Sequence, residues 1–387
     1  MTRPAYEMQR GMGAVFGLNA GWEHPLWFAD VPGTEDTNGF ARQNWFEPVR
    51  REAAMLRDAV GVIDISNFGK YEVTGPGAGD WLDALVANHV PREIGKSCLT
   101  PLIGMRGGVA GDFTITMTGD ESYMMIGSGM AERYHRRFFD MVPLPDGTGF
   151  EVATPRIAGF NVAGPRSREM LAGLTDADLS NEGWRFMRSR RIAVGGVDCL
   201  AIRVSFTGDL GWELHCAVDD QVALYEILLE AAAAHGGGPV GGRALGALRI
   251  EKGYGSWGRE YSPEYWPQEA GLHGLIKLDK DFLNKEAYLK ISNTPPRESL
   301  TMFEVNVTDN ADANGGEPIF LADGTPVGRV TSGSYGYTVG KSLAIGYARE
   351  GVVSAGDRVE IFILGKPHAA TVLDKPPFDA GGERLRA

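Results

Sequence analysis

Hydrophobic and polar positions follow two different periods along the first 290 residues. Apolar residues recur at helical spacing in five segments, 45–59, 78–86, 131–141, 222–234 and 243–252. Short apolar or alternating runs bounded by glycine, proline and polar turns predict strands at 61–66, 71–74, 109–117, 122–126, 150–154, 157–162, 192–205 and 212–216. Helices and strands in this mixed order predict an α+β layered fold.

The pattern changes after a segment that reads as a linker. Residues 291–299 contain the pair Pro295-Pro296, and beyond them short strands are separated by turns at 322–325 and 355–357. We therefore predict two regions: 1–290, built from two intertwined α+β subdomains, and a small β-barrel domain at 298–387.

Composition narrows the classes of function. The net charge of −12 disfavours a polyanionic partner, so nucleic acid is not expected. No apolar run reaches membrane-spanning length and residues 1–10 are polar, which together favour a cytoplasmic protein with no membrane partner. The seven histidines and three cysteines show no metal-ligand spacing, so no metal site is expected.

A glycine-rich segment near the start, 11–17, has the wrong spacing for a dinucleotide loop, and no strand precedes it. The sequence therefore predicts no flavin or nicotinamide fold. Any oxidation of a substrate would have to take place on another protein.

Three segments carry candidate chemistry, and their residues of interest are Asp112, Glu213 and Arg249. Asp112 interrupts the apolar strand after Arg106-Gly-Gly, and Glu213 is delivered by a glycine-bearing turn onto a strand between Trp212 and Leu214. A carboxylate such as Glu213 can accept two parallel hydrogen bonds from an amidine-like edge, as on a pterin ring. Each acid could equally be a solvated turn or strand residue, and Arg249 could be one partner of an ordinary ion pair with Glu251.

Taken together and in order, these segments resemble the aminomethyltransferase (glycine cleavage T-protein) family. The resemblance covers nearly the whole chain and is strongest to the folate-binding C-terminal half of dimethylglycine and sarcosine dehydrogenases. Its matching segments are 61–66, 106–112, 162–165, 207–213, 248–251, 269–272, 277–280, 330–333 and 345–347.

The resemblance implies a three-lobed, ring-like protein whose centre binds tetrahydrofolate, the last lobe being the β-barrel. It implies that Asp112 is the catalytic residue and that Glu213 and Arg249 bind the cofactor. Trp212, which flanks Glu213, joins this cofactor set. Three positions depart from the T-protein pattern: Gly111 replaces the first aspartate of a pair, Phe206 replaces a tyrosine, and Gly127 replaces an asparagine.

Phe206 and Gly127 are predicted to lie at the cofactor site. The three departures favour a dehydrogenase-like or demethylase relative over a glycine-cleavage enzyme. The preferred reaction takes a carbon unit from an N-methylated amine, already oxidised to an iminium by a separate flavoprotein, and gives 5,10-methylene-tetrahydrofolate. An aromatic group is the predicted binding site for the methylated substrate: Tyr254, Trp257, Tyr261 and Trp266, with Tyr265 beside them.

Two alternatives stay open. In the first, the protein is a direct demethylase that passes a methyl group from an onium or methylated substrate to tetrahydrofolate. In the second, it is a folate-binding regulatory protein without enzymatic activity. Gly95-Lys-Ser-Cys98 offers a lysine and a cysteine in the wrong arrangement for the motif of such relatives, which ranks this alternative below both enzymes.

Overall fold

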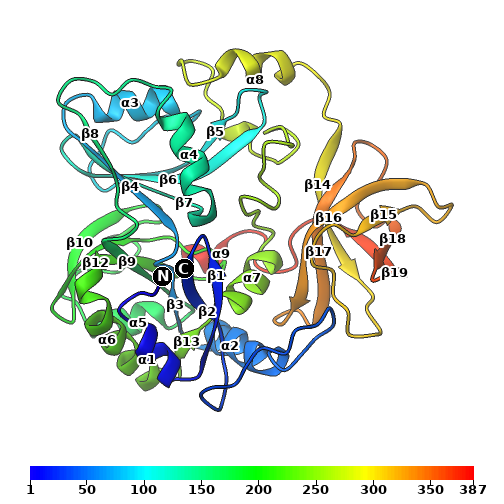
Figure 1. Cartoon of the computed structure of the whole chain (residues 1–387), viewed down its shortest axis with the longest axis horizontal. Helices are drawn as coiled ribbons and strands as arrows, with labels where there is room; N and C mark the ends of the chain where they lie inside the picture. The colour runs from blue at the N-terminus through cyan, green and yellow to red at the C-terminus, as the bar shows by residue number, and fades with distance from the viewer.

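The computed structural model describes residues 1–387 and consists of three lobes. Figure 1 shows two α+β lobes stacked on the left, a barrel on the right, and the chain between α7 and α8 running through the middle. The predicted α+β class and the C-terminal barrel are confirmed.

The first lobe is built on a five-stranded sheet. Its strands, in the spatial order β5-β6-β7-β4-β8, are Ser97–Ile103, Val109–Gly119, Ser122–Gly127, Gly69–Thr74 and Gly149–Val152. Helices α3 (Ala78–Leu85) and α4 (Glu132–Phe139), the latter preceded by the short η1 (Gly129–Ala131), cover one face. Odd-numbered β6 residues such as Phe113 and Ile115 pack with Leu82, Phe138 and Phe139 of these helices into the core of the lobe.

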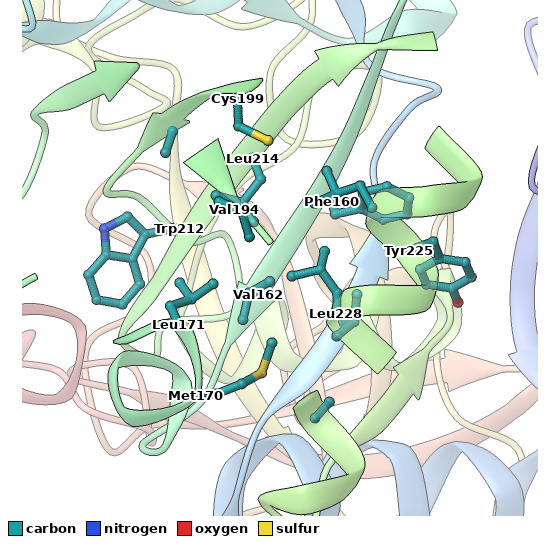
Figure 2. Close-up of a cluster of buried hydrophobic side chains, with 14 of the residues drawn as sticks. Phe160, Val162, Met170, Leu171, Val194, Cys199, Trp212, Leu214, Tyr225 and Leu228 are labelled. Carbon is teal, nitrogen blue, oxygen red and sulfur yellow. The ribbon is translucent and has the colours of Figure 1, made fainter. Parts of the chain in front are cut away.

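The second lobe is built on a six-stranded sheet in the order β10-β11-β12-β9-β3-β13. The strands are Ser189–Val194, Val197–Ile202, Gly211–Ala217, Ile157–Ala163, Gly61–Asp64 and Gly238–Val240. Helices α5 (Ser167–Ala172) and α6 (Gln221–Ala234), with η2 (Val218–Asp220) before α6, cover one face. Figure 2 shows the core beneath them, where Val162, Trp212 and Leu228 come from three different elements.

A second helical layer joins the N-terminal segment to this sheet. Helix α1 (Tyr6–Gly11) leads into the hairpin of β1 (Ala14–Asn19) and β2 (Trp22–Phe28), which packs with α2 (Phe46–Asp58) and α7 (Gly242–Glu251). Along α2, Val49, Ala53 and Leu56 recur at helical spacing, and all three are buried. This apolar stripe is the reason the predicted helix forms where it does.

The chain then passes through η3 (His273–Leu275) and α8 (Lys285–Ser292) to a closed six-stranded barrel. The barrel strands β14 to β19 are Glu298–Val305, Pro318–Phe320, Pro326–Gly336, Lys341–Arg349, Arg358–Ile363 and Lys366–Leu373. A last short helix, α9 (Glu383–Arg386), returns to the α+β lobes. No helix combines the length and the apolar character that crossing a bilayer requires.

The structure corrects one predicted element and adds others that the sequence did not indicate. The strand predicted at 192–205 is two strands, β10 and β11, because Gly195 and Gly196 both take positive φ angles and turn the chain into a hairpin. Strand β5 and the β1–β2 hairpin were not predicted. Strand β5 is mostly buried, but Thr100 and Pro101 interrupt its apolar run, while β1 and β2 are partly exposed and contain Gly17 and Pro25; none of them gives a clear alternation.

Candidate functional site

The two predicted acids lie on the faces by which the two sheets pack together. Met124 and Ile126 of β7 meet Leu200 and Ile202 of β11 in a small hydrophobic cluster, which we call the inter-sheet seam. Thr114, two residues after Asp112, pairs with Ile126, while Glu213 pairs with Ile202. Because cross-strand partners share a face, Asp112 and Glu213 both project from the seam side of their sheets.

Asp112 is half-buried, and its carboxyl group accepts no hydrogen bond from any other residue, only from its own backbone N–H. Burial raises the pKa of Asp112 to about 6, against a smaller opposing effect of a backbone N–H. A carboxyl that titrates near neutrality and keeps its lone pairs free can hold or release a proton at working pH.

Glu213 has buried polar neighbours on the same side of the sheets. Its Oε2 atom is 3.4 Å from Nε2 of His215, two residues further along β12. Burial lowers the pKa of His215 although the Glu213 carboxylate raises it. Lys70 of β4 also faces the seam, since it pairs with Ile126, and burial lowers the pKa of Lys70 to about 7. Its Nζ donates to the main-chain oxygens of Ile65, Ser66 and Phe68.

Arg249 is buried in α7 and its terminal nitrogens are engaged by the protein itself. Nη1 donates to Glu260 Oε2 at 2.8 Å and to the Tyr254 carbonyl, and Nη2 donates to Ser332 Oγ at 2.6 Å. The predicted partner Glu251 instead binds Arg57. Arg249 therefore joins α7 to the segment after it and to barrel strand β16.

The predicted aromatic residues separate into three places. Trp257 packs against His135 of α4, with ring centroids 5.3 Å apart, and Tyr261 lies close enough to Asp112 that, after burial, this carboxylate contributes most to raising the pKa of the phenol. Tyr254 stacks against Phe206 at 5.9 Å. Trp266 lies elsewhere, beneath the guanidinium of Arg297.

Two glycines of the first lobe owe their small size to Phe113. A Cβ atom at Gly127 would lie 2.6 Å from the Phe113 ring, and one at Gly111 would lie 2.9 Å both from that ring and from Nε2 of His135. Both positions therefore face the α3–α4 core rather than the seam. The phenylalanine and the histidine fill the space that larger residues at 111 and 127 would need.

Trp212 is fully buried on the opposite side of β12 from Glu213. It packs in the core of the second lobe (Figure 2). Its ring lies edge-on to Trp184 at 6.4 Å. The structure thus does not bring Trp212 to the seam side, because neighbouring residues of a strand point to opposite faces.

A cavity of about 430 Å³ lies between the N-terminal segment, α7 and the barrel. Arg42, Arg243, Arg249 and Arg259 line it, but Asp112 and Glu213 do not. Arg42 and Arg243 are paired with Asp312 and Asp36. Arg259 is exposed and has no carboxylate partner, so the cavity offers one free cation to an anionic group.

Sequence reasoning missed four polar residues around the site: Lys70, His135, His215 and Glu260. His215 could have been found, because it follows Glu213 by two positions on the same strand face. The other three depend on contacts between distant segments, which no local pattern reveals.

Two family models together match most of the chain. The model of the GCVT N-terminal domain matches residues 5–280, and that of the glycine cleavage T-protein C-terminal barrel domain matches residues 299–379. The chain superposes on the glycine cleavage system aminomethyltransferase T from Bartonella henselae with a TM-score of 0.84 at 23% identity, covering 98% of both chains. This likeness supports the fold.

Among curated proteins, the chain is 36% identical to mitochondrial dimethylglycine dehydrogenase of Mus musculus over 93% of its own length and 42% of the relative's. It is 32% identical to the formaldehyde-forming 4-methylaminobutanoate oxidase of Paenarthrobacter nicotinovorans, over 99% and 46%. The aminomethyltransferase of Thermotoga petrophila matches over 98% of both chains at 28% identity. The chain spans less than half of the dehydrogenase and oxidase, and it belongs to the glycine cleavage T-protein (aminomethyltransferase) family.

Proposed function

We propose that this protein transfers a one-carbon unit from an N-methylated amine to tetrahydrofolate, with Asp112 as the catalytic residue. The observation that carries the proposal is the pair of carboxyl groups, Asp112 and Glu213, on the facing sides of two sheets. One acid titrates near neutrality and accepts no hydrogen bond from any other residue, and the other lies beside a buried histidine and a buried lysine.

The residues present fit a reduced pterin. The Glu213 carboxylate accepts no strong hydrogen bond from a protein donor, so its two oxygens remain available to the amidine-like edge of the ring. Phe206 and Tyr254 offer aromatic surface near the end of α7, and Arg259 offers a cation to a carboxylate tail. When bound, tetrahydrofolate supplies two amine nitrogens that accept the carbon unit.

Asp112 performs two tasks in this proposal. Its carboxylate orients the donor and stabilises positive charge on the iminium, because an anion in a partly desolvated place interacts strongly with a nearby cation. It would also accept, at Oδ1 or Oδ2, the proton that the attacking amine loses as the new carbon–nitrogen bond forms, which a carboxyl with a pKa near 6 does readily at neutral pH.

The donor must be activated before transfer, since a neutral amine is a poor leaving group. We infer that a flavoprotein oxidises the N-methyl amine to an iminium, which also supplies the electrophilic carbon. Relatives named as dimethylglycine dehydrogenase, sarcosine dehydrogenase and 4-methylaminobutanoate oxidase support this route, because each name describes oxidation of an N-methyl amine. The flavin partner is then a separate protein or a further part of a longer chain.

One observation favours direct demethylation as the second candidate. Trp257 and Tyr261 lie on the same turn, and Tyr261 is close to Asp112, so a methylated onium ion could contact an aromatic face and a carboxylate together. An onium methyl group needs no prior oxidation.

A product assay separates these candidates. Purified protein is incubated with tetrahydrofolate and a panel of N-methyl and S-methyl compounds, with and without an amine oxidase, and the folate product is identified. We expect methylene-folate only with the oxidase. Methyl-folate formed without oxidase would establish the demethylase instead, and folate binding without turnover on any donor would favour a regulatory protein.

The role of Asp112 has its own test. Replacing Asp112 by Ala should lower turnover by roughly 10²–10⁴-fold, the usual contribution of a positioned acid or base. Folate affinity, measured by calorimetry, should stay within about tenfold, or roughly 1.4 kcal/mol. A fully active variant would show that Asp112 is not the catalytic residue.

A further inference from the structure

The segment between α7 and η3 contains a tight turn, 255–261, that belongs to no helix or named strand. Gly258 takes a φ of +84°, its N–H donates to the Tyr261 carbonyl at 2.7 Å, and the Tyr261 N–H returns to the Ser256 carbonyl. Trp257 and Tyr261 also form an isolated β-bridge. The turn thus presents two aromatic side chains from one compact piece of backbone.

Glu260 of this turn is fully buried and its carboxylate joins three parts of the molecule. Oε2 accepts from Arg249 Nη1 of α7 at 2.8 Å and from the Ser256 N–H at 2.9 Å. Oε1 accepts from Thr331 Oγ1 of barrel strand β16 at 2.7 Å. The Glu260 carbonyl accepts from the Tyr347 hydroxyl at 2.7 Å, a second link to the barrel.

We propose that Glu260 is a positioning residue through which the barrel holds Trp257 and Tyr261 against the lobe that carries Asp112. One end of the turn is bonded to α7 and β16, while the other reaches α4, where Trp257 packs against Tyr134 and His135 at 5.4 and 5.3 Å. Arg249 completes the link by donating to Ser332 of the same barrel strand. The inference rests on the proposed function, because it assigns the turn to the Asp112 site.

A second buried carboxylate provides a matched control. Glu269 is 1% exposed and also pairs with an arginine, Arg297, while accepting from the main-chain N–H of Trp266. It anchors the neighbouring segment and not the 255–261 turn. Glu260→Gln and Glu269→Gln each remove the charge of a buried carboxylate that pairs with an arginine, Arg297 being more exposed than Arg249, and only the first loosens the turn.

Two variants of Thr331, on barrel strand β16, disturb the same link less than Glu260→Gln does. Thr331→Val removes the hydroxyl that donates to Glu260 while keeping the shape of the side chain, and Thr331→Ser restores that hydroxyl. Neither variant leaves Arg249 without its carboxylate. This pair keeps the test decisive if Glu260→Gln does not fold.

Two readouts distinguish positioning from a loss of stability. At an equal folded fraction, Glu260→Gln should lower kcat on the order of tenfold to a hundredfold, as expected when reacting groups are misplaced, and Thr331→Val should lower it less. The KM for folate should rise by less than kcat falls, because Glu213 lies outside the turn, even though Arg259, the proposed partner of the folate tail, lies within it. Thr331→Ser and Glu269→Gln should keep the wild-type kcat.

The second readout is the acid side of the pH–kcat/KM profile. Tyr261 packs from the turn against the cluster that contains Val109, three residues before Asp112 on β6, and the Asp112 carboxylate raises the pKa of its phenol. Glu213 and His215 belong to the facing side of the other sheet, and Lys70 shares the sheet of Asp112. A loosened turn admits water, which lowers the pKa of Asp112 from about 6 towards its ordinary value, so the acid limb should move down by about half a unit or more.

The outcomes separate cleanly. Equal losses of kcat in Glu260→Gln and Glu269→Gln, an unmoved acid limb, or a fully active Thr331→Val would each overturn the positioning role. If the wild type carries out the transfer but Asp112→Ala is equally active, the proposed site itself has failed, and the variants of Glu260 are not needed to show it.

Discussion

Asp112 illustrates how one residue can serve activity at a cost in stability. Its side chain accepts no hydrogen bond from any other residue, and burial raises its pKa to about 6 from an ordinary value of 3.8. Because the pKa of Asp112 is higher in the folded than in the unfolded protein, the protein loses stability as this carboxyl ionises. The stability is fully present below the unfolded pKa and is lost as the pH rises through the folded pKa.

The upward direction of this pKa shift gives a prediction for Asp112→Asn. The variant should be more stable than the wild type at pH 8, on the order of 1 kcal/mol after allowance for partial exposure, and the difference should vanish near pH 4. Urea unfolding at both pH values measures it. A variant less stable than the wild type at pH 8 would mean that the carboxylate makes a favourable contact in the free protein.

Residue-scale packing also accounts for the glycines at positions 111 and 127. The Phe113 ring occupies the space beside Gly127, and Phe113 with His135 occupies the space beside Gly111. The glycines and the bulky residues are therefore complementary, and a side chain at either glycine would require a shift in the core of the first lobe.

At the scale of elements, helix α2 holds β2 and α7 through a single buried carboxylate. Glu52 accepts from the Phe28 N–H at 2.7 Å and from the N–H of Gly241, the N-cap of α7, at 2.8 Å. Burial raises the pKa of Glu52 to about 7 although both N–H groups lower it. The start of the helix that carries Arg249 thus depends on an acid from another helix.

Glu52→Gln should therefore destabilise the protein. The amide has only one oxygen acceptor for two buried N–H groups, and leaving one unpaired costs about 1–3 kcal/mol. Glu47→Gln, on the same helix but paired with Arg50 at the surface, should change stability by less than about 1 kcal/mol. Thermal unfolding of both variants provides the comparison, and equal effects would count against this role of Glu52.

Elements also show where prediction from sequence succeeded. The helices at α2, α3, α6 and α7 and most strands were predicted close to their bounds, because each buries one face and carries the matching period. The strand predicted at 192–205 was wrong at Gly195-Gly196, where two glycines turn the chain within an otherwise apolar run. Those two glycines were the signal that could have divided it.

At the scale of the whole molecule, buried ion pairs connect segments far apart in the chain. Arg57 of α2 binds Asp209 at 2.5 Å and Glu251 of α7 at 2.9 Å, and Asp209 also binds Arg384 of α9 at 2.6 Å. Glu251 accepts in turn from Thr338 in the turn after β16. This network ties the α+β lobes, the barrel and the last helix together.

Two arginine variants test how much that network contributes. Arg57→Met should destabilise by about 3–5 kcal/mol, because Asp209 and Glu251 are both buried and lose a shared partner. Arg384→Met should cost only about 1 kcal/mol, since its side chain is 42% exposed. Chemical denaturation of both measures the difference, and similar losses would mean that the network acts as exposed ion pairs do.

The sequence alone determined the α+β class, the C-terminal barrel and the family, because periodicity and ordered motifs are local properties that survive without coordinates. It also indicated Asp112 and Glu213 as candidates, since an acid inside an apolar strand stands out. Only the tertiary structure decided that both acids face the inter-sheet seam, that Trp212 lies in a core, and that Arg249 is bound by Glu260 and Ser332. These facts depend on which strand faces which, and that arrangement is set by the packing of segments distant in the chain.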